Sequence, residues 1–340
     1  MSTNHFDHGA LAATGILITN LGTPEAPTEK ALRKYLREFL WDRRVVDVPR
    51  PIWWIILNGF ILTTRPKKSA EAYQQVWTDE GSPLMSYALK QKQKLQNYFD
   101  QQSKAPVKVA LGMRYGTPSI ESALQELRAA NAQRILVFPL YPQHATATTA
   151  STFDAVGLAM KKSQWIPDLR FISSYHDNQG YITTLANHIN TYWKENGKPE
   201  KLFFSFHGMP EKTLAAGDPY FCHCHKTARL VAEKLELSEN EWQVAFQSRF
   251  GKEEWLKPYA DETLIKLGKA GLKSIDVVCP GFSADCLETI EEMGQENKEN
   301  FQHAGGGQYR YIPALNDSED HIAALANIIK SHTLDWPLWN

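Results

Sequence analysis

Residues 201–210 read "KLFFSFHGMP", a run of strand-forming residues that stops at a histidine, a glycine and a proline. A nearly continuous apolar run of this kind predicts a strand covered on both faces, as in parallel sheets. Seven further runs of this type are separated by helical segments: residues 15–20, 107–113, 134–141 and 169–175 in the first half, and 242–248, 274–280 and 309–315 in the second. This alternation predicts an α/β protein with two doubly wound halves, each built on a four-stranded parallel sheet flanked by helices.

The length of 340 residues is sufficient for two domains, since a domain commonly spans about 150 residues. The expected domains are residues 1–165 together with about 309–340, and residues 166–308. The first half is interrupted, because residues 21–106 separate its first two strands. Insertions of this length usually carry function rather than core packing.

The composition excludes several functional classes. The chain has 37 Lys and Arg against 38 Asp and Glu, with no long block of like charge, so no nucleic-acid partner is expected. It contains neither G-x-x-x-x-G-K-[ST] nor a G-x-G-x-x-G after the first strand, which argues against nucleotide chemistry. Residues 1–15 lack the cationic and apolar regions of a signal peptide, and a cytoplasmic location is the expectation.

The insertion contains an apolar stretch, "PIWWIILNGFIL" at residues 51–62, with basic residues on both sides. It is too short to cross a bilayer, which takes about 20 apolar residues in a helix. Two interpretations remain open. The stretch is either a buried or cofactor-lining helix, or an exposed lip that contacts a membrane surface with its tryptophans at the interface.

His207 ends its predicted strand, and ligands of open parallel sheets bind beyond the carboxyl ends of the strands. The following Gly208 allows close approach of the backbone. A neutral imidazole accepts protons near neutral pH and also binds transition metals. The alternative is a strand-end histidine that only satisfies a loop carbonyl.

Residues 283–297, "SADCLETIEEMGQEN", predict a helix with an acidic face just after another strand. Ser283 or Asp285 can cap this helix. Four carboxylates lie on or near one face: Asp285, Glu288, Glu292 and Glu296. The alternative is a solvated acidic face near a helix N-terminus. The functional interpretation is favoured because this helix and His207 open onto one crevice, where an imidazole and a row of carboxylates suit the delivery of a divalent metal.

Seven segments, in order along the chain, closely resemble motifs of the ferrochelatases, the terminal enzymes of protoheme synthesis. They are "ILITNLGTPEAPT" (16–28), "LGMRYGTPSI" (111–120), "YPQHATATTAST" (141–152), "SFHGMP" (205–210), "FQSRFG" (246–251), "WLKPYADETL" (255–264) and "CPGFSADCLETIEE" (279–292). The resemblance runs from about Gly15 to about Ile329, and it is to the proteobacterial type without the cluster-binding C-terminal extension of animal enzymes.

This resemblance implies two Rossmann-like domains of the class I chelatase type and a lyase that inserts Fe²⁺ into protoporphyrin IX with release of two protons. It implies no required cofactor, since Fe²⁺ is a substrate, and peripheral contact with the cytoplasmic membrane through the lip at about residues 50–65.

The resemblance also implies roles for individual residues. The histidine of "SFHG" and the glutamate of "LET", His207 and Glu288, then face each other across the porphyrin as catalytic and metal-binding residues. Which of the two takes the pyrrole protons stays open. Asp285, Glu292 and Glu296 match the acidic path of the family. The stretches that contact the macrocycle or its propionates contain Tyr73, Ser82, Arg114 and Tyr115.

The chain has four cysteines: Cys222, Cys224, Cys279 and Cys286. So sparse a set is not a disulfide framework. Four thiolates could instead hold a [2Fe–2S] cluster, as in ferrochelatases that place their cysteines differently from animal enzymes. The alternative is four unligated thiols in a reducing cytoplasm.

Two other functions fit the same sequence. One is a chelatase for coproporphyrin III or for cobalt. The other is a two-lobed protein that binds a tetrapyrrole without turnover.

Overall fold

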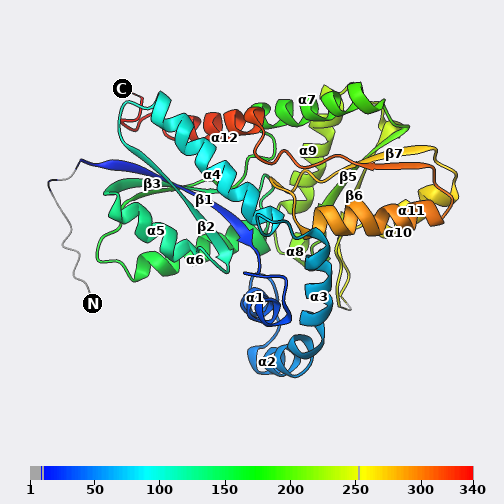
Figure 1. Cartoon of the computed structure of the whole chain (residues 1–340), viewed down its shortest axis with the longest axis horizontal. Coiled ribbons are helices and arrows are strands. Elements are labelled where there is room, and N and C mark those ends of the chain that lie inside the picture. Colours follow the sequence, from blue (N-terminus) through cyan, green and yellow to red (C-terminus); the bar gives the residue numbers. More distant parts are fainter. Residues whose placement is uncertain (1–8, 10, 252, 340) are drawn as a thin grey trace.

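The structure is a computed structural model that describes residue 9, residues 11–251 and residues 253–339. Most of the N-terminal stretch for which no signal peptide is expected lies outside the described residues. Two four-stranded parallel sheets stand side by side, with strand orders β2-β1-β3-β4 and β6-β5-β7-β8 (Figure 1). This confirms the predicted fold class of two doubly wound halves.

The strands are β1 (Ala13–Gly22), β2 (Val107–Tyr115), β3 (Ala132–Pro139), β4 (Asp168–Phe171), β5 (Lys201–His207), β6 (Trp242–Gln247), β7 (Ser274–Val278) and β8 (Gln308–Tyr311). The first-half helices are α1 (Glu29–Trp41), α2 (Arg50–Ile56), η1 (Leu57–Ile61), α3 (Leu62–Val76), α4 (Pro83–Gln102), α5 (Ile120–Ala129), η2 (Thr146–Ala150) and α6 (Ser151–Lys161). The remaining helices are α7 (Gln179–Asn196), α8 (Glu211–Ala215), α9 (Tyr220–Lys234), η3 (Glu239–Glu241), α10 (Ala260–Lys269), η4 (Glu288–Glu296), α11 (Asn297–His303) and α12 (Glu319–Ser331).

The inner strands are buried on both faces, which explains why their sequences are apolar without alternation. In β1, Ile16, Leu17 and Ile18 are completely buried. In β5, Phe203 and Phe204 are equally buried and point to opposite faces of the second sheet. Helices α4 and α5 both pack on β2, while α9 and α10 both pack on β6. Each sheet is therefore the middle layer of an α/β/α sandwich.

The expected domain boundaries are wrong for two strands. β4 pairs with β3 in the first sheet, although a boundary at residue 165 assigns it to the second domain. β8 pairs with β7 in the second sheet, although its residues 309–311 fall in the segment assigned to the first domain. The residues beyond β8 do reach the first half, since α12 packs on α4 as well as on α7.

The insertion between β1 and β2 forms α1, α2, η1 and α3, which project below the two sheets in Figure 1. In α2, the buried Trp53 donates from its indole nitrogen to the carbonyl of Leu40 at 2.7 Å, which ties α2 to α1 within the projection. Neighbouring apolar side chains remain exposed: Ile52, Trp54, Ile55, Ile56 and Phe60. The segment is thus anchored on one face and open to solvent on the other, as an exposed lip requires.

Candidate active site

A cleft of about 520 Å³ opens where the carboxyl ends of strands from both sheets meet the projection. This volume lies within the usual range for small-molecule sites. Its walls come from segments that follow β1, β3, β5, β6 and β7, together with α1, α3 and the start of α4. Parallel strands place their carboxyl ends at one edge, so these distant segments converge on a single site.

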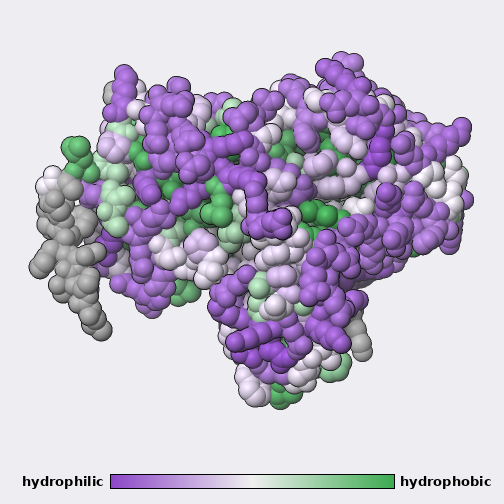
Figure 2. All heavy atoms as spheres, in the orientation of Figure 1, coloured by the Kyte–Doolittle hydropathy of each residue, from purple (hydrophilic) through white to green (hydrophobic). Residues whose placement is uncertain are grey.

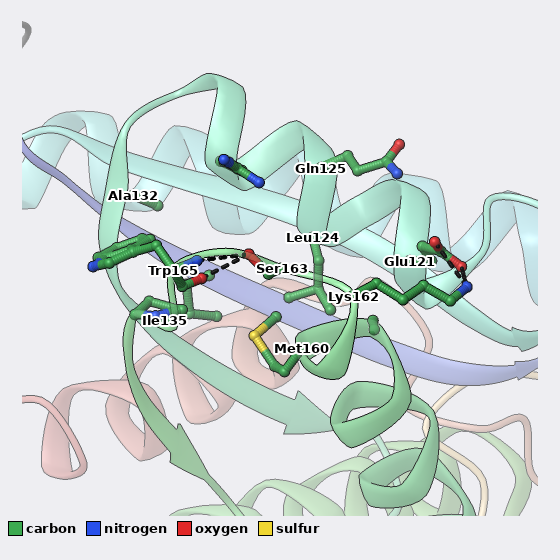
Figure 3. Close-up of a pocket in the computed structure, with 12 residues that line it drawn as sticks. Glu121, Leu124, Gln125, Ala132, Ile135, Met160, Lys162, Ser163 and Trp165 are labelled. Atoms are coloured by element: carbon green, nitrogen blue, oxygen red, sulfur yellow. Dashed lines mark hydrogen bonds and ion pairs between the residues drawn. The ribbon is translucent and has the colours of Figure 1, made fainter. Parts of the chain in front are cut away.

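A second hollow, of about 100 Å³, lies between α5, α6 and β3 (Figure 3). Leu124, Ile135 and Met160 form an apolar floor, and the ion pair between Lys162 and Glu121 closes one side at 2.8 Å. It contains no histidine and is far smaller than the cleft. The cleft is therefore the candidate active site.

His207 is the last residue of β5 and lines the cleft. Its Nδ1 lies 2.7 Å from the carbonyl oxygen of Gly208. A carbonyl only accepts, so this hydrogen bond requires the proton on Nδ1. In the neutral ring, Nε2 then carries a free lone pair, which can accept a proton or bind a metal.

Gly208 is required next to this histidine because two backbones meet there. Its N–H donates to the carbonyl of Gln247 at 2.7 Å. A Cβ at position 208 would lie 2.8 Å from that same oxygen and 3.1 Å from the ring of Trp255. Because glycine has no side chain, the backbone after the histidine can lie this close to the end of β6.

The acidic segment forms the expected helix, but its first nine residues are a π-helix, η4. The predicted caps are wrong, because the helix has no side-chain cap and its N-cap residue is Leu287. Four of its side chains line the cleft: Glu288, Glu291, Glu292 and Glu296. The wider π-turn, with i→i+5 hydrogen bonds, shifts residues relative to the α-helical pattern, and such turns are frequent at functional sites.

Glu292 is the most deeply held of these carboxylates. The backbone N–H of Ser248 donates to one carboxylate oxygen at 2.8 Å, and the Ser248 hydroxyl is hydrogen-bonded to the other. Burial raises the pKa of Glu292 to about 7, and the nearby charge of Glu288 acts in the same direction against the lowering effect of the Ser248 hydrogen bonds. A carboxyl with this pKa exchanges protons near neutral pH.

Gln247 connects the histidine to the acidic helix. It lies opposite His207 in the pairing of β5 and β6. Its side-chain amide donates to the backbone carbonyl of Glu288 at 3.0 Å, while its amide oxygen accepts from the Ser205 hydroxyl at 2.6 Å. The amide orientation is therefore fixed, and one buried side chain relates the positions of the two predicted catalytic residues.

Cationic and aromatic side chains also line the cleft, close to the acidic row. Arg65, Lys68 and Arg249 line it, and the guanidinium of Arg65 lies 5.7 Å from the ring centre of Phe250. Two predicted porphyrin-binding residues, Tyr73 and Ser82, also line the cleft. Ser82 accepts from the N–H of Met85 at 3.2 Å and so begins α4.

The structure does not bring Arg114 or Tyr115 into the cleft lining. Arg114 forms an ion pair with Asp42 at 2.5 Å, and the Tyr115 hydroxyl donates to the same carboxylate at 2.8 Å. The hydroxyl of Ser151 also bonds to Asp42. These residues therefore fasten α1 to β2 and to the start of α6.

Asp285 is likewise outside the cleft lining, unlike the other three predicted members of the acidic path. It is buried and accepts hydrogen bonds from the hydroxyls of Thr289 and Tyr311 and from Ala314 and Asn316. Three of these hydrogen bonds go to Oδ1 and one to Oδ2, so the carboxylate is held firmly by the segments around it.

The four cysteines are not assembled into one ligand set. Cys222 is exposed, whereas Cys224 on the same helix, Cys279 and Cys286 are buried. Across the described residues, no group of three or more His, Cys, Asp and Glu side chains is arranged to hold a metal ion. The four thiols of the predicted cluster site are therefore not grouped among the described residues.

Three cleft residues escaped the sequence-based prediction: Arg65, Lys68 and Glu291. The segment that follows β6 at residues 248–250, "SRF", does line the cleft, as the carboxyl ends of parallel strands are expected to do. Glu291 follows Glu288 by three residues, a spacing that the prediction of the acidic face did not use.

The sequence model of the ferrochelatase family matches residues 13–333. Ferrochelatases of Thioalkalivibrio sulfidiphilus and Nitrosococcus oceani are 56% and 55% identical to this chain, over 98% and 97% of its length and 90% of each relative. The solved structure of SirB from Bacillus subtilis with Fe³⁺ is similar at a TM-score of 0.51 and 13% identity, over 97% of this chain and all of that one. The sirohydrochlorin chelatase SirB of the subspecies spizizenii, solved with cobalt, gives a TM-score of 0.52 at 12% identity. At these identities, the two structures support a similarity of fold and nothing further.

No helix in the described part of the chain has the length and apolar character needed to span a bilayer. The family match covers nearly the whole chain, and the cleft contains the histidine and three of the four carboxylates that the resemblance singled out. The chain therefore belongs to the ferrochelatase family, the metal-chelating lyases of heme synthesis.

Proposed function

We propose that this chain inserts Fe²⁺ into protoporphyrin IX within the cleft, with His207 as the acceptor of pyrrole protons and Glu288 as the last carboxylate to hold the metal. The observation that carries this assignment is the hydrogen bond from His207 Nδ1 to Gly208, which leaves Nε2 as the basic nitrogen. The carboxylates come from a separate element, η4, that lines the same cleft.

The reaction needs both kinds of group. A planar porphyrin holds two N–H protons at its centre, so a metal enters only when the ring is bent and the protons are removed. Binding energy from the walls of the cleft can be used to distort the ring. A base within hydrogen-bond reach then takes protons, while carboxylate oxygens replace the water around Fe²⁺.

The acidic path in this proposal consists of Glu288, Glu291, Glu292 and Glu296, all of which line the cleft. Glu292 is suited to receive a released proton because its pKa is raised by burial to about 7. We assign the propionate groups of the porphyrin to Arg65 and Lys68, with Tyr73 and Ser82, because these cationic and polar side chains line the same cleft.

Anaerobic turnover with protoporphyrin IX and Fe²⁺ tests the proposal, with porphyrin affinity measured in parallel. His207→Ala and Glu288→Gln are expected to lose at least about 100-fold in kcat while porphyrin binding stays within a few-fold. Wild-type rates in both variants would remove the assignment. Turnover is also measured with coproporphyrin III in place of protoporphyrin IX and with Co²⁺ in place of Fe²⁺. Faster turnover with either would mean that the proposed substrate is wrong.

We further propose that the lip contacts an anionic membrane surface. Trp54, Ile55 and Phe60 expose 58%, 64% and 70% of their surface, and Figure 2 shows apolar residues at the lower tip of the projection. Exposed Lys67 and Lys68 follow on α3. Apolar residues beside cations are typical of segments that lie in the bilayer interface, and a hydrophobic porphyrin would have a short route from there into the cleft.

A further inference from the structure

Asn316, in the loop between β8 and α12, has a left-handed backbone with a φ of 50°. Among residues with a side chain, asparagine tolerates this region best. The conformation directs both polar atoms of its side chain to one residue. Its Nδ2 donates to Asp285 Oδ2 at 2.7 Å, and its Oδ1 accepts from the backbone N–H of Asp285 at 2.8 Å.

The backbone of Asn316 is itself held from two other helices. Its carbonyl accepts from Gln91 of α4 at 2.8 Å and from the Nδ1 of buried His321 of α12 at 2.7 Å. Gln91 also donates to the carbonyl of Ser283 at 3.1 Å, just before Asp285. A single asparagine is thus fixed to helices from both halves, and it can hold the loop before η4 in one place.

Asp285 connects Asn316 to the first turn of η4 through its hydrogen bonds. Its Oδ1 accepts from the hydroxyl of Thr289 at 3.0 Å and from the Tyr311 hydroxyl at 2.6 Å. The same Thr289 hydroxyl accepts from the N–H of Cys286 at 3.0 Å. Glu288 lies between Cys286 and Thr289, so its backbone position depends on this network.

We propose that Asn316 is a positioning residue for the chelation reaction, acting through Asp285 to fix the placement of Glu288 in the cleft. This inference rests on the proposed function, because it concerns the carboxylate assigned to hold the metal. Neither Asn316 nor Asp285 lines the cleft. Removing their pairing therefore changes the chemical step rather than contacts with the porphyrin.

The pair allows a reciprocal exchange as the test. Asn316→Asp alone sets a carboxylate against the Asp285 carboxylate, and Asp285→Asn alone sets two amide donors together. Each single variant is expected to lose about 10-fold or more in kcat, since small displacements of a reacting group are costly. In Asp285→Asn/Asn316→Asp, the amide of residue 285 donates to residue 316, and the carboxylate of residue 316 accepts from the backbone of residue 285. Recovery of kcat to within about 3-fold of wild type is expected.

Porphyrin affinity and thermal melting are measured for every variant. Asn316→Gly accepts the same backbone conformation without the side chain, and its kcat is expected to match that of the single variants. It replaces Asn316→Asp in the test if that charged variant does not fold. Asn97→Asp, at an exposed position of α4, is the matched control and is expected to keep wild-type turnover.

The inference is overturned if the exchanged pair remains as slow as the single variants, or if the single variants turn over at the wild-type rate. It is also overturned if porphyrin affinity falls as much as kcat, because the residue would then act on the whole cleft. His207→Ala separates the two proposals. If that variant is inactive while Asn316→Asp is fully active, only the positioning role fails. If His207→Ala is fully active, the proposed function fails first.

Discussion

The backbone N–H of Ser248 donates to the carboxylate of Glu292 at 2.8 Å, from a residue whose φ is 63°. A serine in this left-handed region is strained by about 1–2 kcal/mol, and the conformation turns its N–H and hydroxyl toward the same carboxylate. Strain of this kind persists only where surrounding contacts maintain it, and it is frequent at functional sites. The acidic helix is thus held to the strand end that neighbours His207.

Ser248→Ala is expected to lower kcat by about 10-fold or more, because hydrogen bonds to a charged group contribute about 1.5–3 kcal/mol. The backbone N–H remains, so the fold and porphyrin affinity should persist. Steady-state turnover over a range of Fe²⁺ concentrations measures the effect.

The matched control for this prediction is Ser238→Ala. Ser238 also donates from its N–H and its hydroxyl to one carboxylate, that of Glu241, at 2.8 and 2.6 Å, but at the far end of β6. It should leave turnover unchanged. Equal losses in the two variants would show that the Ser248 contact has no special role in the site.

Glu292 is expected to make the protein less stable as the pH rises from about 4.5 to about 7. Burial raises its pKa in the folded state to about 7 from an ordinary value of 4.5, so the folded protein binds more protons than the unfolded chain in this range. Its contribution to stability is complete below about pH 4.5 and is lost as the pH passes 7, amounting to about 3 kcal/mol.

Denaturant unfolding at about pH 5 and about pH 8 measures this contribution. Glu292→Gln should reduce the difference between the two pH values, because the amide mimics the neutral acid at both. Glu239→Gln, at an exposed position, should leave the difference as in the wild type. An unchanged difference in Glu292→Gln would contradict the shifted pKa.

Gly208→Ala is expected to destabilise the protein by about 2 kcal/mol and to displace His207, since the new Cβ would meet the Gln247 carbonyl at 2.8 Å. Turnover should fall with stability. The control is Gly157→Ala in α6, where nothing lies within 4 Å of the added Cβ. That change should stabilise the helix by up to about 1 kcal/mol. Thermal melting distinguishes the two, and equal effects would mean that residue 208 has room for a side chain.

Replacement of Trp54 and Phe60 by Gln is expected to weaken binding to vesicles of phosphatidylglycerol and phosphatidylethanolamine by at least about 10-fold, because less apolar surface can enter the interface. Cosedimentation measures the bound fraction. Leu334→Gln removes a comparably exposed side chain, 60% accessible, near the C-terminal end and should bind as the wild type does. If wild type and the lip variant bind equally, or neither binds, the lip has another role.

The sequence by itself determined the two sheets and the family. The apolar runs are local features, and buried parallel strands require them wherever the rest of the chain lies. His207 was predicted from the same pattern, because the cleft of an open parallel sheet lies beyond the carboxyl ends of its strands and His207 ends one of them. The acidic helix was predicted in the same way, because it begins after another strand of that sheet, whereas the choice of Glu288 within it came from the family resemblance.

Only the tertiary structure decided which polar residues reach the cleft. Arg114 turns to Asp42, and Asp285 to Asn316, because each finds a partner distant in sequence that satisfies its charge or its lone pairs. Glu291 also lines the cleft, three residues after Glu288 on the helix η4. Residue spacing determines local faces, whereas the partners that orient a polar side chain come from segments brought together by folding.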